Sequence, residues 1–419
     1  MLFTQTLCEC SLFIYIYIYI TKQIRKSNRT YMIRQVMASF DYNDPKRSKT
    51  ESESPFAAGA GAGAGAAVSS SRRKSLLIID PQSDFSDAAE NIRDKNGALV
   101  VPGASRDYSR IIQYMRSDPE VCDVHVSLDT HTDRHIGHPG FWDVKLEETS
   151  EWEPATDKNS GLTILKIDAD NKISGSFNLV AKKPIYQFRP RCYDPASYPA
   201  LCRYVNEYLH FYDQDADGKF KPENKNSQFA WIWFNHCLEE TEGHRVAVEL
   251  QAELNTFAAQ PGKKVYYHIK GQNNLAEMYS IFSAERPVAD EWQESLRSYL
   301  YTGTQEGHYD NRGKESYEAV RSSRNLNTRL NTELMDILLG ITPQSPAGVN
   351  TVVVCGQART HCVKSSKIDL MAYARQRGVA SDRLIFMQNC SSPIVGVPDD
   401  LADIVREQGY TVDESTFGI

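Results

Sequence analysis

The sequence lacks a hydrophobic run long enough to cross a membrane. The apolar run at residues 12–20 (LFIYIYIYI) is far shorter than the about 20 residues that a membrane-spanning helix needs. No basic segment precedes it and no small-residue cleavage site follows it, as a secretory signal would require. We therefore expect no membrane association. A targeting role for this segment stays open, and Met37 is an alternative start of the chain.

An excess of positive charge is also absent. Lys and Arg number 47 against 54 Asp and Glu, so the formal net charge is −7. Nucleic-acid-binding domains usually carry a basic patch, whereas the basic residues here are scattered, apart from a small cluster at Arg72, Arg73 and Lys74. The composition therefore argues against a nucleic acid as partner.

Zinc-type pairs of cysteines are missing as well. The 9 cysteines are spread along the chain and none forms a C-x-x-C pair. An odd number of scattered thiols is typical of a reducing compartment and not of a disulfide framework. We expect a cytoplasmic protein, with the nucleus as a further location.

Residues 1–73 differ from the rest of the chain. After residue 40 they run through polar sequence into an Ala-Gly repeat (AAGAGAGAGAA) and a Ser-Arg patch. So few bulky apolar side chains cannot offset the entropy of ordering the backbone. We predict a disordered extension over residues 1–73, followed by one domain over residues 74–419.

From residue 74 onward, short apolar runs alternate with longer amphipathic segments. Apolar runs of this kind are typical of strands buried on both faces, and their alternation with helices indicates a parallel sheet of the α/β class. We therefore predict a parallel β-sheet with helices on both faces. The expected strands are residues 76–79, 124–128, 265–269, 351–355 and 384–387, and the expected helices are residues 105–115, 244–257, 330–339, 363–376 and 401–408.

Two long polar stretches interrupt this pattern, at about residues 145–230 and 286–328. Loops of that length are uncommon in a compact domain unless they carry a function. We interpret both as insertions into one domain.

Chemically useful side chains follow the expected strands. Asp80 follows the first, Lys270 follows the third, and Cys362 opens the helix after the fourth. The carboxyl ends of parallel strands meet at one edge of the sheet, where α/β proteins place their sites. A carboxylate can take the proton of a thiol, and a lysine and a helix N-terminus favour the resulting thiolate. The alternative is that Cys362 is a buried structural cysteine.

A metal site is expected at the same edge. Asp129 and His131 are two residues apart at the end of the second strand, so both side chains face one side. Carboxylate and imidazole donors suit zinc, and also iron or manganese. Read alone, Asp129 and His131 are more typical of a solvated loop and His236 of a buried structural histidine, so the metal site depends on further motifs.

The ordered segments LLIIDPQSDF, DTHTDRHIGH, WFNHCLEETEG, IKGQNNLAEMYSIF and CGQARTHCV resemble the motifs of the isochorismatase-like cysteine hydrolases, and among them the nicotinamidases. The resemblance covers most of residues 75–370 in patches and implies the isochorismatase-like hydrolase fold. It also implies the roles of single residues: Asp80, Lys270 and Cys362 as catalytic residues, Asp129, His131, His236 and His135 as metal ligands, Phe85 and Trp233 as the aromatic pair around the substrate ring, and the backbone N–H groups of Ala358 and Cys362, after a cis peptide bond, as the oxyanion site.

Several positions depart from the family pattern. The family's ATDYC is here ARTHC, with Arg359 and Thr360 in place of Thr-Asp, and His138 stands where the family has Phe. His135 and His138 therefore compete for the fourth place around the metal. His361, next to the nucleophile, is expected to pack.

The resemblance implies a metal-dependent cysteine amidohydrolase that converts nicotinamide to nicotinate and ammonia in NAD salvage, through a thioester. The retained Asp129, His131 and His236 favour nicotinamide as the small-molecule substrate. Two alternatives stay open: a related hydrolase of another small amide, and a catalytically inactive binding protein on the same fold. A homo-oligomer is a further expectation.

Residues 213–224 (DQDADGKFKPEN) have part of the spacing of a calcium-binding EF-hand loop. Asp213, Asp215 and Asp217 match its first ligands, but Asn224 stands where a bidentate Glu is needed. Either a weak Ca²⁺ site or an ordinary polar turn fits this pattern.

Overall fold

The computed structural model describes residues 73–88, 98–177, 185–213, 229–300 and 326–417. The chain divides into two units, residues 1–71 and 72–419, and the described residues all belong to the second. The extension predicted to be disordered, residues 1–73, lies outside the described residues except for Arg73. Its disorder and the domain boundary at residue 74 stay predictions.

The core of the second unit is a six-stranded parallel sheet in the order β12-β11-β10-β1-β2-β9. Its central strands are continuous apolar runs, and every residue of β10 is buried. This is why these runs form interior strands and not the edge of a sheet. The strands are β1 (Lys74–Ile79), β2 (Val121–Asp129), β9 (Lys264–Lys270), β10 (Thr351–Gly356), β11 (Leu384–Met387) and β12 (Thr411–Asp413).

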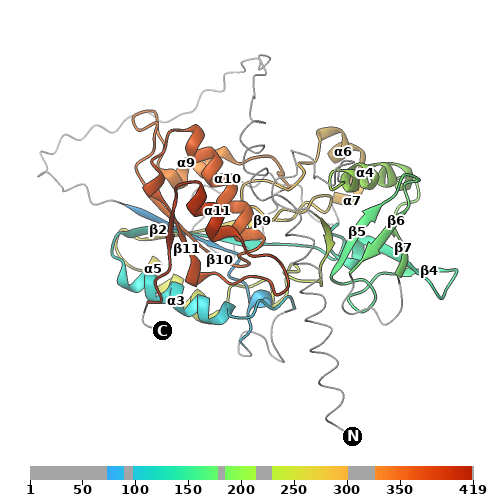
Figure 1. Cartoon of the computed structure of the whole chain (residues 1–419), viewed down its shortest axis with the longest axis horizontal. Coiled ribbons are helices and arrows are strands. Elements are labelled where there is room, and N and C mark those ends of the chain that lie inside the picture. Colours follow the sequence, from blue (N-terminus) through green and yellow to red (C-terminus); the bar gives the residue numbers. More distant parts are fainter. Residues whose placement is uncertain (1–72, 89–97, 178–184, 214–228, 301–325, 418–419) are drawn as a thin grey trace, which may run out of the picture. The chain divides into compact units, whose positions relative to one another are not determined.

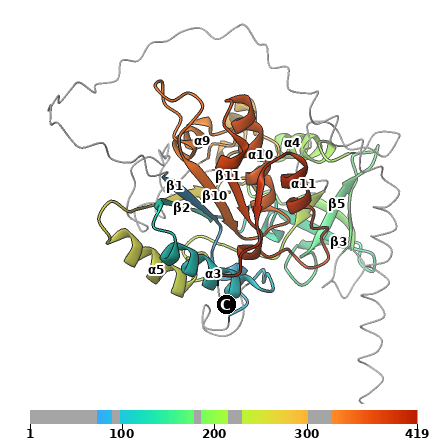
Figure 2. The ribbon, with the colours of Figure 1, turned by 60° about the vertical axis from the view of Figure 1, so that its left-hand side comes forward.

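Helices cover both faces of this sheet. Figures 1 and 2 show α3 and α5 on one face and α9, α10 and α11 on the other. Helix α3 buries Tyr108, Ile111, Ile112 and Met115, whose spacing places them on one side of a helix. The predicted α/β class, with helices on both faces of a parallel sheet, is confirmed. The helices are α3 (Ala104–Ser117), α5 (Val248–Ala258), α9 (Thr332–Leu339), α10 (Cys362–Gln376) and α11 (Leu401–Glu407).

The first insertion folds into a second sheet, which the sequence analysis did not predict. It is antiparallel, in the order β4-β3-β7-β6-β5-β8. Trp142, Tyr204 and Ile232 belong to its own buried cluster, onto which helix α4 (Tyr198–His210) packs. The strands are β3 (Trp142–Leu146), β4 (Trp152–Pro154), β5 (Thr163–Ile167), β6 (Ile173–Ser176), β7 (Ile185–Pro190) and β8 (Ala230–Ile232).

The second insertion is described only in part. Its first residues form α6 (Asp290–Ser295) and α7 (Arg297–Leu300), and Tyr299 and Leu300 join the buried cluster of the second sheet. Residues 301–325 are outside the described part. Among the described helices, none combines the length and the apolar character needed to cross a membrane. Short 3₁₀ turns complete the order at Ser83–Phe85, Pro139–Phe141, Ser381–Arg383 and Gln388–Cys390.

Candidate active site

Three charged side chains meet at the carboxyl ends of neighbouring strands. Asp80 directly follows β1, while Asp129 and Lys270 end β2 and β9 and lie opposite each other in the register. Because β1, β2 and β9 are adjacent, their ends place these side chains at one edge of the sheet. All three are buried, with 3% or less of each residue exposed.

Lys270 is the centre of this group. Its Nζ lies 3.0 Å from Asp80 Oδ2 and 2.9 Å from Asp129 Oδ1. The same atom lies 3.7 Å from the Sγ of Cys362 and donates a hydrogen bond to the carbonyl of Met278. The structure therefore brings together the carboxylate, the ammonium and the thiol that the sequence singled out.

Burial and charge set the protonation of these groups. Burial raises the pKa of Cys362 well above its usual value, because the effect of Lys270 in the opposite direction is smaller. Burial likewise raises the pKa of Asp80, against the opposing effect of Lys270. Burial disfavours the charged form of Lys270, but Asp129 and Asp80 outweigh it and raise the pKa of this ammonium. The resting sulfur is therefore a thiol, and attack by it requires a base.

Asp80 is oriented by a residue that the sequence analysis missed. Ser127 Oγ donates to Asp80 Oδ1 at 2.6 Å and accepts from the backbone N–H of Asp80 at 2.9 Å. Asp80 has a positive φ of 43°, a conformation that Asp tolerates better than most residues. Its other oxygen, Oδ2, faces Lys270. Side chains two residues apart on a strand lie on the same face. The position of Ser127, two residues before Asp129 in β2, was therefore the sequence signal that could have placed it at the site.

A second missed residue, Gln82, fixes the end of β2. Its side-chain amide donates to the carbonyl of Asp129 and accepts from the N–H of the same residue, both at 2.7 Å. It also donates to the carbonyl of His244. A side-chain amide that pairs with both backbone groups of one residue acts like an additional piece of strand, and it holds Asp129 in place.

Helix α10 begins at Cys362, as predicted, with His361 as its N-cap. The peptide bond between Gln357 and Ala358 is cis, as the family resemblance implied. In the described part of the chain, the backbone N–H groups of Ala358 and Cys362 donate no hydrogen bond. These two donors are therefore available to a ligand beside the sulfur.

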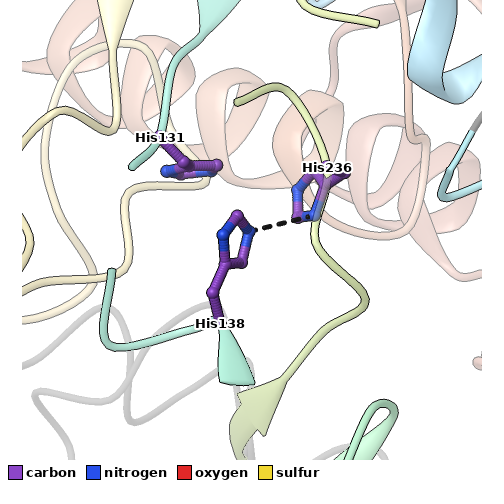
Figure 3. Close-up of side chains that lie close together, drawn as sticks. All are labelled: His131, His138 and His236. Atoms are coloured by element: carbon purple, nitrogen blue, oxygen red, sulfur yellow. Dashed lines mark hydrogen bonds between the residues drawn. The ribbon is translucent and has the colours of Figure 1, made fainter. Parts of the chain in front are cut away.

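Next to this group lies a cluster of buried histidines. His131, His138 and His236 each offer a nitrogen, and these nitrogens lie within 4.8 Å of one another (Figure 3). The rings in Figure 3 face one another from three different segments of the chain. Asp129 Oδ2 lies 3.0 Å from the Nε2 of His131 and 3.5 Å from the Nε2 of His236.

The hydrogen bonds of this cluster fit a divalent metal. The Nδ1 of His131 pairs with the carbonyl of Gly271 and that of His236 with the carbonyl of Phe234, so both Nδ1 atoms carry the proton. Their Nε2 lone pairs then face Asp129 Oδ2, and a lone pair and a carboxylate repel unless a proton or a metal ion lies between them. Backbone carbonyls that fix the tautomer in this way are typical of metal-binding histidines.

His135, the other predicted ligand, lies beside this cluster but outside the three-histidine group. Its ring centroid is 4.1 Å from that of His131. Its Nε2 donates to the carbonyl of Ala276 and its Nδ1 accepts from the N–H of Gly137.

Glu277, which the sequence analysis did not single out, is a buried carboxylate near the histidines. Its Oε1 accepts from the N–H of Met278. Burial raises the pKa of Glu277, and the imidazole of His131 opposes this effect. No spacing signal marks Glu277, because it reaches the site through the loop after β9.

Aromatic side chains lie beside His236 and beside His361, the neighbour of Cys362 in the chain. Phe85 packs against His236 with ring centroids 5.5 Å apart. The Nε1 of Trp233 donates to Tyr279 Oη, and the centroid of the Trp233 ring lies 4.9 Å from that of the His361 ring. His361 therefore packs between aromatic rings, as expected, and burial lowers its pKa to about 3.

Two other features are separate from this site. Asp213 of the expected calcium loop is paired with His210, while Asp215 and Asp217 lie outside the described residues. A calcium site therefore has no support here. A surface cavity of about 490 Å³ is lined by Met115, Glu253 and Lys263, among others, and includes none of the candidate site residues.

Neither a protein-family model nor a curated protein matches the chain. Several solved structures are similar to it in fold. A yeast nicotinamidase is 15% identical over 82% of this chain and 100% of its own, with a TM-score of 0.41. An Acinetobacter baumanii nicotinamidase and pyrazinamidase is 14% identical over 83% and 99%, with a TM-score of 0.40. A Pyrococcus horikoshii pyrazinamidase in complex with zinc is 14% identical over 82% and 99%, with a TM-score of 0.36. Similarity at this level establishes neither a family nor an activity for this chain.

Proposed function

We propose that this chain is a cysteine amidohydrolase that converts nicotinamide to nicotinate and ammonia. One observation carries the proposal: the ammonium of Lys270 lies 3.0 Å from the carboxylate of Asp80 and 3.7 Å from the sulfur of Cys362. A buried ion pair is costly unless its members are well paired, and a thiol beside it gains a base and a positive charge at once. Such a constellation is typical of an activated nucleophile.

In the first half-reaction, Asp80 takes the proton of Cys362, and the thiolate forms a bond to the amide carbon. The N–H groups of Ala358 and Cys362 donate to the oxygen that becomes negative. Asp80 then returns the proton to the amide nitrogen, the carbon–nitrogen bond breaks, and ammonia leaves a thioester on Cys362.

In the second half-reaction, Asp80 takes a proton from water, and the hydroxide adds to the thioester carbon. The carbon–sulfur bond then breaks, and the sulfur recovers its proton from Asp80. The balance is one amide and one water converted to one carboxylic acid and one ammonia. Lys270 keeps its proton throughout and offsets the charge of the sulfur.

Asp129, His131 and His236 would hold a divalent metal, with zinc the first choice for this donor set and iron or manganese the alternatives. When bound, such an ion would accept the lone pair of the ring nitrogen and so orient the substrate. Phe85 and Trp233 would lie against the faces of the ring. These features together favour a flat aromatic amide with a ring nitrogen, and the product would enter NAD salvage.

An uncharged substrate also fits Arg359, one of the residues that depart from the family pattern. Its guanidinium is paired with Asp399 at 2.6 Å and donates to the carbonyls of Gln388 and Ser391. These partners occupy the guanidinium, so Arg359 is not offered to a substrate carboxylate.

The test is ammonia release from nicotinamide by the full-length chain with zinc present. Cys362→Ala should lower kcat/KM by at least about 10³-fold, because the covalent route is lost. Cys355→Ala is the matched control: Cys355 is also a buried free cysteine, on β10 directly before the site. This control should keep activity within about threefold of wild type, since Cys355 touches no reacting group.

Full activity of Cys362→Ala would overturn the proposal. A wild-type chain that releases ammonia from another small amide but not from nicotinamide would keep the mechanism and change the substrate. A chain that releases ammonia from neither, yet binds nicotinamide, would support the binding-protein alternative instead.

A further inference from the structure

Four imidazoles lie together at this site, and their hydrogen bonds distinguish their roles. His131 and His236 each donate an Nδ1 proton to a backbone carbonyl, which leaves their Nε2 lone pairs facing Asp129. A metal ligand needs such an unshared lone pair. These two histidines therefore meet the chemical requirement for ligands.

His135 does not meet this requirement. A backbone carbonyl can only accept, so the contact between His135 Nε2 and the carbonyl of Ala276 at 3.0 Å places the proton on Nε2. The other nitrogen, Nδ1, accepts the N–H of Gly137 at 3.1 Å. Both nitrogens are committed to backbone groups, and neither has a lone pair left for a metal.

His138 is the imidazole with uncommitted nitrogens. It is fully buried, and its Nδ1 has no hydrogen-bond partner among the described residues. Its Nε2 lies 3.2 Å from the Nδ1 of His236, whose proton is already donated to the carbonyl of Phe234 at the shorter distance of 2.7 Å. An unpaired polar group in the interior is costly, and each such group in a native structure needs an explanation.

The geometry explains why a metal satisfies His138. Ligand atoms around a tetrahedral ion with bonds of about 2.0–2.1 Å lie about 3.3 Å apart. Asp129 Oδ2 is already 3.0 and 3.5 Å from the Nε2 atoms of His131 and His236. His131, His138 and His236 each offer one ring nitrogen within 4.8 Å of the other two, and the His138 ring centroid is 4.7 Å from that of His131. The three rings face one another (Figure 3), so an ion between them would take a lone pair from each.

We propose that His138 is the fourth protein ligand of the metal and that His135 is a positioning residue which holds the loop of His138. The inference rests on the metal site of the proposed function. It gives the ion three nitrogen donors and one oxygen donor from the protein. His135 acts through its bonds to Gly137 and Ala276, which hold the segment that carries His138.

The experiment uses Co²⁺ alone as the probe, added to the metal-free full-length chain. In His138→Cys, a thiolate at a ligand position produces a sulfur-to-cobalt charge-transfer band in the near-ultraviolet. His135→Cys is the matched control, three residues away in the same buried loop. We expect the band, absent from wild type, in His138→Cys and not in His135→Cys.

A second measurement compares the visible cobalt spectra of the alanine variants at saturation. His135→Ala should keep the wild-type spectrum with weaker binding, while His138→Ala should change it and bind cobalt at least about 10–100-fold more weakly. A charge-transfer band in His135→Cys, or in neither cysteine variant, would overturn the assignment. Both measurements are independent of catalysis, so a failure of nicotinamide hydrolysis leaves this result readable on its own.

Discussion

At the scale of single residues, Gly271 shows how closely the backbone approaches the site. It follows Lys270 with a φ of +80°, and its carbonyl accepts from the Nδ1 of His131. A Cβ atom at this position would lie 2.6 Å from Asp129 Oδ1 and 2.7 Å from His131 Cε1. Any side chain would therefore displace two of the proposed metal ligands.

Gly271→Ala should lower the affinity for zinc by more than about tenfold, since misplacing ligands has effects of this size. Gly262→Ala is the matched control: Gly262 has a φ of +76° and nothing within 4 Å of the added Cβ. Both variants carry the same backbone penalty of about 1–2 kcal/mol. Urea unfolding measures the loss of stability in each variant, which at Gly271 also includes the close contacts of the added Cβ, and competition with a zinc chelator measures affinity. Equal zinc affinities in the two variants would contradict this prediction.

The sequence identified the residues whose positions follow from the ends of strands. Asp80, Asp129 and Lys270 were predictable because parallel strands carry their last residues to one edge. The sequence could not decide between His135 and His138 as the fourth ligand. The roles proposed for them depend on the carbonyls of Ala276 and of other residues far along the chain. Local spacing contains no information about such partners.

At the scale of elements, helix α10 combines the nucleophile with an unusual lysine. Lys367 is fully buried, its Nζ has no hydrogen-bond partner among the described residues, and it lies 5.8 Å from the ring of Tyr410. Burial lowers the pKa of Lys367 from 10.5 to about 7. Between these two values the unfolded chain binds a proton that the folded chain does not. Unfolding therefore takes up a proton, and the free energy of unfolding rises with pH from about 7 to about 10.5.

Lys367→Met should stabilise the protein, because a methionine fills the same space without a charge to desolvate. The linkage gives roughly 2–5 kcal/mol at pH 7, and the gain should shrink as the pH is raised towards 10. Urea unfolding of both proteins at pH 7 and pH 9.5 measures this difference. The control is Lys364→Met on the same helix, which removes the ion pair with Asp400 and should not stabilise. A gain for Lys367→Met that is equal at both pH values would rule out the proposed cause.

Five strands of the parallel sheet were predictable, whereas its edge strand β12 and the strands of the second sheet were not. Strands buried on both faces appear in sequence as continuous apolar runs, as in β10. In the second sheet, β3 alternates buried and half-buried residues and β8 has only three residues. Such strands become recognisable only when their partners are known, since their stability comes from pairing across the sheet.

At the scale of the whole described unit, the two sheets share the segments that carry the histidines. His131 follows β2 of the parallel sheet, His138 precedes β3 of the antiparallel sheet, and His236 follows β8. Backbone hydrogen bonds join these segments: the N–H of Trp233 donates to the carbonyl of Gly137 at 2.7 Å. A metal held by these histidines would therefore also link two buried clusters that the sequence does not connect by any continuous apolar pattern.

Removing the metal should consequently loosen the second sheet more than the first. A ligand that binds only the folded state stabilises the elements that hold it. Here those are the end of β2, which Gln82 also fixes, and the segments beside β3 and β8, for which the metal would be the main support. After treatment with a chelator, amide hydrogen exchange should speed up at least about tenfold in residues 135–141 and 231–236, while β1 and β10 change little. Added zinc should restore the protection. Asp129→Asn, which lacks one charged ligand, should exchange as fast as the metal-free wild type in the same segments. Uniform acceleration across both sheets would mean that the ion supports the whole unit and not the junction between its sheets.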